Sequence, residues 1–248
     1  MTAPAPGPLV DGVLFDVDDT LVDTHGAFAA ALAAVAREWL PGLDPARDSE
    51  VLAHWRADAH GRYRQYTRGE VSYRDQRMGR ANDLHAAFGG PALDDAAYDR
   101  WNALFEERFT GAWAAHEDAA ATVRRLLDAG IRVGALTNAA TEYQVRKLTR
   151  AGLAQDVPLL VGVDTLGFGK PDPRVFAEAC RRLGTEPGRT AYVGDELDVD
   201  ARAAVAAGLR GVWLARPGLG AKHANATEAL PGDVVIGTLD ELPGVLGL

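Results

Sequence analysis

Three carboxylates lie close together near the start of the chain, in the stretch FDVDDTL at residues 15–21. They are Asp16, Asp18 and Asp19, and they end or follow the short apolar run GVLFD, which predicts a buried strand over residues 12–16. Like charges this close repel one another, and burying them without partners costs free energy. A cation, or a reaction that uses carboxylates, is therefore expected at the end of this strand.

Polar side chains also follow other predicted strands. They occur at Thr137-Asn138, in the loop GFGKPDP (167–173) that contains Lys170, and in GDELDVD (194–200). Each group alone could be no more than a helix cap or a turn. Because ligands of open parallel sheets bind beyond the carboxyl ends of the strands, four such groups favour one shared site.

Other motifs do not fit these residues. A calcium loop beginning at Asp16 needs Gly at its sixth position and Glu at its twelfth, where the chain has Leu21 and Ala27. A phosphate loop ending at Lys170 needs Gly at 164 and Ser or Thr at 171, where the chain has Asp164 and Pro171. No His–Cys spacing typical of a metal site is present either.

The surrounding pattern indicates which elements position these groups. Strands are predicted at 12–16, 131–138, 158–163, 190–195, 211–215 and 233–237. From residue 118 onward the strands alternate with predicted helices, at 118–129, 141–151, 173–184 and 198–208. This alternation predicts an α/β fold, a Rossmann-like parallel sheet with helices on both faces.

Residues 25–113 instead show helical spacing, in the segments 25–40, 51–66, 73–88 and 96–109, with no predicted strand. We therefore expect an all-helical cap domain over 23–113, inserted into a core domain of 9–22 and 114–248. The first residues, 1–8, read as a disordered lead.

Composition narrows the class of partner. The 248 residues carry a net charge of −9, which argues against nucleic acid or an anionic membrane as the main partner. No apolar stretch is long enough to predict a membrane span, and the start lacks the features of a signal peptide. Cys180 is the single cysteine, which suits a reducing cytoplasm, while the oligomeric state is not readable.

The sequence resembles the haloacid dehalogenase-like phosphohydrolases. FDVDDTL is similar to the first motif of that family, LTN to the second, GKPDP to the third and VGDELDVD to the fourth. The helical insertion resembles the first type of cap found in the family. This resemblance spans nearly the whole chain and implies the same core fold.

The resemblance also implies roles for the acids. Asp16 would be the nucleophile that forms an aspartyl phosphate, and Asp18 the general acid and then the base that activates water. One Mg²⁺ would bind the Asp16 carboxylate, the Asp18 backbone carbonyl and Asp195.

Four further residues receive roles from the same resemblance. The Thr137 hydroxyl and the Asn138 backbone would hold phosphate oxygens, and Lys170 would neutralise charge on the nucleophile and the transferring group. Asp200 would orient Lys170 or a water of the metal from behind.

The branch of the family follows from two features. An acid at Asp18 favours phosphoryl chemistry, because a halide leaving group needs no proton. No lysine precedes Lys147, which argues against cleavage of phosphonoacetaldehyde through a cap lysine. Hydrolysis of a small phosphorylated metabolite, such as a nucleoside monophosphate or a sugar phosphate, is the expected function. A phosphomutase and a non-catalytic binding module remain alternatives.

The predicted cap has a basic segment. Residues 56–80 contain seven arginines against three acids. Arg77 and Arg80 are one helical turn apart and share a face with Tyr73, so we predict that this face turns toward the active site and binds the leaving group. The alternative is an ordinary solvated helix face.

Overall fold

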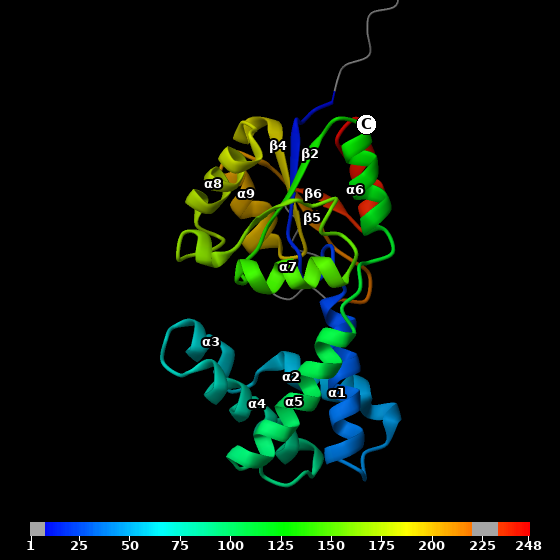
Figure 1. Cartoon of the computed structure of the whole chain (residues 1–248), viewed down its shortest axis with the longest axis vertical. Helices are drawn as coiled ribbons and strands as arrows, with labels where there is room; N and C mark the ends of the chain where they lie inside the picture. Colours follow the sequence, from blue (N-terminus) through cyan, green and yellow to red (C-terminus); the bar gives the residue numbers. More distant parts are fainter. Residues whose placement is uncertain (1–7, 220–232) are drawn as a thin grey trace, which may run out of the picture. The chain divides into compact units, whose positions relative to one another are not determined.

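The computed structural model describes residues 8–219 and 233–248, so the predicted disordered lead lies outside the described residues except for its last position. The described chain forms two compact units (Figure 1). One contains the residues up to Thr24 and those from Trp113 onward, and the other runs from His25 to Ala112.

The first unit is built on one parallel sheet of six strands in the order β3-β2-β1-β4-β5-β6, which confirms the predicted fold class. The chain order reverses between the neighbours β1 and β4, and this is the point where open parallel sheets bind ligands. The strands are β1 (Gly12–Phe15), β2 (Arg132–Leu136), β3 (Leu159–Val161), β4 (Thr190–Gly194), β5 (Arg210–Leu214) and β6 (Val234–Ile236).

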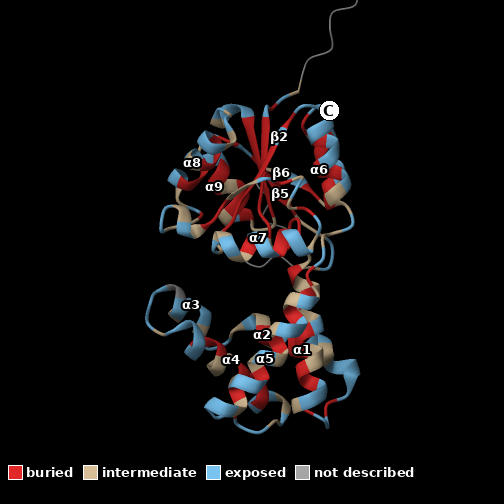
Figure 2. Cartoon of the chain, viewed as in Figure 1, coloured by how far each residue is buried: buried red, intermediate tan, exposed pale blue. Residues whose placement is uncertain are grey.

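Helices cover both faces of this sheet (Figure 1). On one face, α8 (Pro173–Leu183) and α9 (Ala203–Ala206) enclose a core with the side chains of Leu14, Leu136 and Tyr192. On the other lies α6 (Ala119–Asp128), which contacts the short C-terminal α10 (Leu242–Val245). Both faces of β1 are therefore buried, which explains its wholly apolar sequence, and Figure 2 shows most of the middle of the sheet coloured as buried.

Local sequence sets the ends of α8. Asp172 precedes the helix and accepts a hydrogen bond from the Arg174 N–H at 3.0 Å, while Pro173 occupies the first helical position. The helix stops at Gly184, whose φ of 76° lies in the left-handed region that favours glycine.

The predicted helix over 198–208 has a different form. Leu197–Arg202 make a π-helical turn, and only Ala203–Ala206 are α-helical. The wider turn accompanies a buried side chain, Asp200, which accepts a hydrogen bond from the Glu196 N–H at 2.9 Å. Gly194 makes room for it, since a Cβ at that position would lie 2.3 Å from Asp200 Oδ2.

The regular elements of the second unit are all helices among its described residues. Its helices are α2 (Asp48–Ala57), α3 (Arg62–Thr67), α4 (Tyr73–Phe88) and α5 (Asp95–Gly111), preceded by α1 (Thr24–Trp39), which begins at the last residue of the first unit. Stacked aromatic rings of Trp55, Trp101 and Phe105 fill its interior. None of the described helices is both long and apolar enough to cross a membrane.

One predicted helix of this unit, 51–66, is broken into α2 and α3. Asp58 (φ 41°) and Gly61 (φ 62°) adopt left-handed conformations between them. The Asp58 carboxylate then accepts hydrogen bonds from the N–H groups of Arg62 at 3.1 Å and Tyr63 at 2.9 Å, which caps the start of α3. This local capping outweighs the helical spacing of the segment.

Candidate active site

The centre of the site is a buried lysine held among acids at the end of β1. Lys170 Nζ donates hydrogen bonds to Asp16 Oδ1 at 2.9 Å, Asp200 Oδ1 at 2.6 Å and the Tyr192 hydroxyl at 2.7 Å. Asp16 directly follows β1, and its N–H donates to the Val193 carbonyl of β4 at 2.8 Å. The structure thus brings together residues from the first, third and fourth motifs.

Charge is unbalanced at this centre. Burial raises the pKa of Asp16 well above its ordinary value; Lys170 opposes this, and Asp200, Asp195 and Asp18 add to it. Burial alone would lower the pKa of Lys170, but the attraction of Asp16 and Asp200 raises it above its ordinary value. Lys170 therefore stays protonated, and its single positive charge does not neutralise the surrounding carboxylates.

The residues present fit a divalent cation. Oxygen atoms of Asp16, Asp195 and Asp200 all lie within 4.8 Å of one another. Three carboxylates form a set of hard oxygen donors, which is the chemistry that Mg²⁺ prefers. Asp195 follows β4, and its backbone carbonyl accepts a hydrogen bond from Trp213 Nε1 of β5 at 3.0 Å, which fixes the turn.

Asp18 has its own set of partners. Its Oδ1 accepts hydrogen bonds from Thr24 Oγ1 at 2.6 Å and from Lys147 Nζ, and its Oδ2 accepts one from Gln144 Nε2 at 2.6 Å. Burial would raise the pKa of Asp18, but Lys147 and, less strongly, the two neutral donors outweigh it and lower the pKa to about 2. The next residue, Asp19, makes the turn with a left-handed φ of 57°.

Thr137 and Asn138 follow β2 as predicted, and their side chains have different hydrogen-bond partners. Thr137 Oγ1 accepts hydrogen bonds from Gln144 Nε2 at 3.2 Å and the Ala139 N–H at 3.3 Å. The Asn138 amide instead bonds to both backbone groups of Lys170, accepting from its N–H at 2.6 Å and donating to its carbonyl at 2.9 Å. The side chain of Asn138 thus holds the loop that carries the lysine.

Four side chains that contact the site residues were not predicted from the sequence: Tyr192, Gln144, Lys147 and Thr24. Tyr192 lies within a predicted strand and reads as an ordinary core aromatic. A signal did exist for Gln144 and Lys147, because they occupy the buried face of the helix α7 (Thr141–Arg150) at the three-residue spacing that apolar side chains usually take.

Arg77 and Arg80 belong to the helical unit and have partners inside it. Arg77 forms an ion pair with Glu106 at 2.9 Å, and its guanidinium lies 4.4 Å from the centre of the Phe105 ring. Arg80 donates to the Trp55 carbonyl at 2.5 Å and lies over the ring of the same residue. Both are poorly exposed, so a solvated helix face does not describe them, and their binding of substrate stays a prediction.

A parallel sheet that gathers acids and a buried lysine at its switch point defines an α/β enzyme suited to a cation and a phosphate group. The family model of the haloacid dehalogenase-like hydrolases matches residues 10–208, and the chain belongs to this family.

Curated relatives narrow the class further. The chain is 29% identical to the glyceraldehyde 3-phosphate phosphatase of Methanopyrus kandleri, over 84% of this chain and 85% of the relative. It is 35% identical to the phosphoserine phosphatase of Thermus thermophilus, over 64% of this chain and 60% of the relative. With the family match, these relatives make the chain an enzyme of the phosphatase branch, a phosphoric monoester hydrolase.

Solved structures agree on the fold. The hydrolase YfnB of Bacillus subtilis, bound to magnesium, superposes with a TM-score of 0.74 at 22% identity, covering 96% of this chain and 99% of that one. At this identity the likeness concerns the fold alone.

Proposed function

We propose that the protein hydrolyses a small phosphomonoester in a Mg²⁺-dependent reaction through an aspartyl phosphate on Asp16. The observation that carries this proposal is the buried Asp16–Lys170–Asp200 cluster at the switch point of the sheet. Such a cluster offers an anionic nucleophile beside a fixed positive charge, and the phosphatase relatives support the same reaction class.

In the first half of the reaction, an oxygen of Asp16 attacks phosphorus and the bond to the leaving oxygen breaks. Lys170 stabilises the negative charge on Asp16 and on the transferring group from its fixed position. Asp200 and the Tyr192 hydroxyl keep the ammonium in place, since both lie within 2.7 Å of Nζ. The Thr137 hydroxyl and the Asn138 backbone hold oxygens of the phosphoryl group.

Asp18 handles the protons. Because its pKa of about 2 leaves it ionised in the free site, Asp18 first takes a proton, which a singly protonated phosphate group of the substrate can supply. It passes this proton to the leaving oxygen in the first half and removes a proton from the attacking water in the second, which releases inorganic phosphate and restores Asp16. Asp16, Asp195 and the Asp18 backbone carbonyl are the residues that would hold Mg²⁺, which when bound would neutralise phosphate charge.

The curated relatives favour a small anionic metabolite as substrate. Besides the two above, the ribulose-1,5-bisphosphate 5-phosphatase of Halopiger xanaduensis is 30% identical over 89% of this chain and 90% of the relative. Their named substrates differ, so the specificity of this chain must come from residues outside the shared motifs. We propose that residues 23–113 form the cap domain of this enzyme and residues 9–22 and 114–248 its core domain, and that Arg77 and Arg80 contribute to its specificity. The single cysteine, Cys180, supports a cytoplasmic location.

The test is phosphate release from a panel of phosphorylated metabolites by the purified protein. We expect release that stops in excess chelator and returns when Mg²⁺ is restored. Full activity in excess chelator would contradict the metal assignment. Transfer of the phosphoryl group to a second hydroxyl of the sugar, without release, would instead identify a phosphomutase.

A further inference from the structure

Two polar side chains on the buried face of α7 have no part in the mechanism above. Gln144 and Lys147 are 0% and 2% exposed, respectively. The ammonium of Lys147 lies 5.5 Å from the centre of the Trp113 ring and 5.2 Å from that of Tyr143. Burying an amide and an ammonium beside aromatic rings costs free energy unless both find strong partners.

The partners of these two side chains are residues of the proposed reaction. Gln144 Nε2 bridges Asp18 Oδ2 at 2.6 Å and Thr137 Oγ1 at 3.2 Å, and Lys147 Nζ bonds to Asp18 Oδ1. The orientation of the Gln144 amide follows from chemistry, because its oxygen would repel the Asp18 carboxylate if the group were reversed.

These bonds leave defined atoms available for a substrate. Thr137 Oγ1 already accepts hydrogen bonds from Gln144 and from the Ala139 N–H, so its own proton is left to donate elsewhere. Three donors occupy lone pairs of the Asp18 carboxylate, which has about four, and its side chain is still 29% exposed.

We propose that Gln144 and Lys147 are positioning residues of the phosphatase reaction. They fix the Asp18 carboxylate and the Thr137 hydroxyl relative to each other, so that the leaving oxygen and a phosphoryl oxygen of one substrate meet their partners together. This inference rests on the proposed function, since it assigns the geometry of the same site.

The consequence is a dependence on the leaving group. An alkyl phosphate has a poor leaving group and needs a well-placed acid, whereas p-nitrophenyl phosphate has a good leaving group and needs little acid help. A misplacement of about 1 Å at a reacting group can lower a rate by about 100-fold. Loss of the clamp should therefore slow the alkyl ester far more than the aryl ester.

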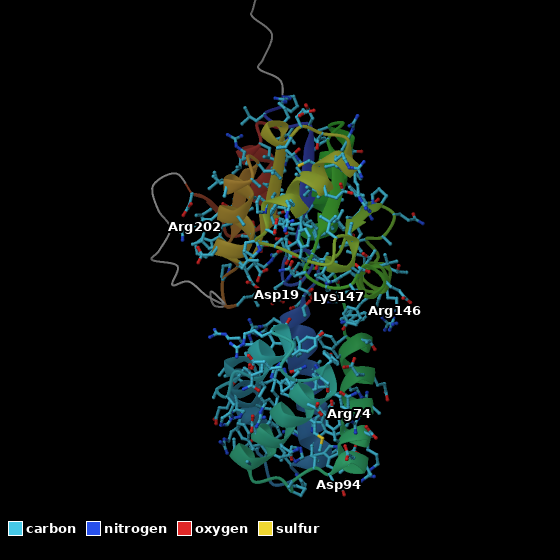
Figure 3. The ribbon with its side chains drawn as sticks, turned by 90° about the vertical axis from the view of Figure 1, so that its left-hand side faces the viewer. Asp19, Arg74, Asp94, Arg146, Lys147 and Arg202 are labelled. Carbon is cyan, nitrogen blue, oxygen red and sulfur yellow. The ribbon has the colours of Figure 1, made fainter. Side chains whose placement is uncertain are left out.

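The experiment compares Lys147→Met and Gln144→Leu with the wild type, using glycerol 2-phosphate and p-nitrophenyl phosphate. Arg146→Met is the matched control, because Arg146 is the exposed basic neighbour of Lys147 on α7 (Figure 3). We expect Gln144→Leu, which changes no charge in the site, to lower kcat about 100-fold on the alkyl ester and less than about 10-fold on the aryl ester. Lys147→Met should slow the alkyl ester less, because it also removes the positive charge that keeps Asp18 ionised. KM for both esters should stay within about threefold, and Arg146→Met should resemble the wild type.

Equal losses on both esters in Gln144→Leu would overturn the inference and assign Gln144 and Lys147 a structural role alone. Should Gln144→Leu not fold, Lys147→Arg, which keeps the charge, decides by the same ratio of rates. A wild type that releases phosphate from neither ester nor from the metabolite panel would refute the proposed function itself.

Discussion

Replacing Lys170 with methionine tests the electrostatic centre of the site. The change keeps the length of the side chain and removes an ammonium that lies 2.9 Å from Asp16 Oδ1 and 2.6 Å from Asp200 Oδ1. At an effective dielectric constant of about 20, each of these contacts represents roughly 6 kcal/mol of Coulomb attraction. Desolvation offsets much of that attraction, and removing one partner of a buried pair costs about 3–5 kcal/mol overall.

This loss of stability should depend on pH. The raised pKa of Lys170 means that its stabilisation is present below the ordinary lysine pKa of 10.5 and is lost only as the pH rises through the higher folded value. In the variant, the pKa of Asp16 rises further above 3.8, so its burial destabilises the folded state increasingly as the pH rises above that value. The difference between variant and wild type should therefore be smaller at about pH 5 than at about pH 8.

Thermal unfolding and steady-state kinetics measure the two effects of Lys170→Met. We expect the melting temperature near neutral pH to fall by an amount on the order of 10 °C, and kcat to fall about 100- to 1000-fold. Arg181→Met on α8 is the control, since Arg181 is exposed and forms an ion pair with Glu178 of the same helix, away from the residues of the site. A folded variant with kcat within about tenfold of the wild type would refute the role of Lys170 as an electrostatic stabiliser.

Three further substitutions test the remaining assignments. Asp16→Asn should abolish turnover, because an amide is not a competent nucleophile, and near-normal rates would contradict the covalent mechanism. Asp18→Asn should slow turnover on alkyl esters but still allow acetyl phosphate to phosphorylate Asp16, which intact-mass spectrometry would detect as a phosphoenzyme. Arg77→Ala should raise KM for the natural substrate more than for p-nitrophenyl phosphate. A lower melting temperature with an unchanged ratio of KM values would show that Arg77, paired with Glu106, serves the interior of the helical unit alone.

The sheet could be predicted because each strand is a short apolar run that ends at a turn or a polar residue. All six predicted strands overlap the observed ones, and they pair into one parallel sheet. The form of the helix over 198–208 could not be predicted, because its π-helical first turn accompanies the burial of Asp200 against Lys170. That contact joins residues 30 positions apart, and no local pattern reports it.

The site was predictable where chemistry and strand ends coincide. Lys170 lies within hydrogen-bond distance of both Asp16 and Asp200, since the carboxyl ends of neighbouring parallel strands share one edge. Gln144 and Lys147 were not predicted, because a polar residue on the buried face of a helix acquires meaning only from its partner, here Asp18, more than 120 positions earlier.

The use of lysine rather than arginine at two positions is a signal for the site that the composition of the sequence already contains. The chain has 23 arginines and three lysines, and the two lysines within the described residues, Lys147 and Lys170, both contact acids of the candidate site. Arginine presents a wide planar fork, whereas lysine is a compact point charge that can donate in three directions. Lys170 uses all three, toward Asp16, Asp200 and Tyr192. In a chain that uses arginine almost everywhere else, a lysine therefore marks a place where a small cation must fit among several acceptors.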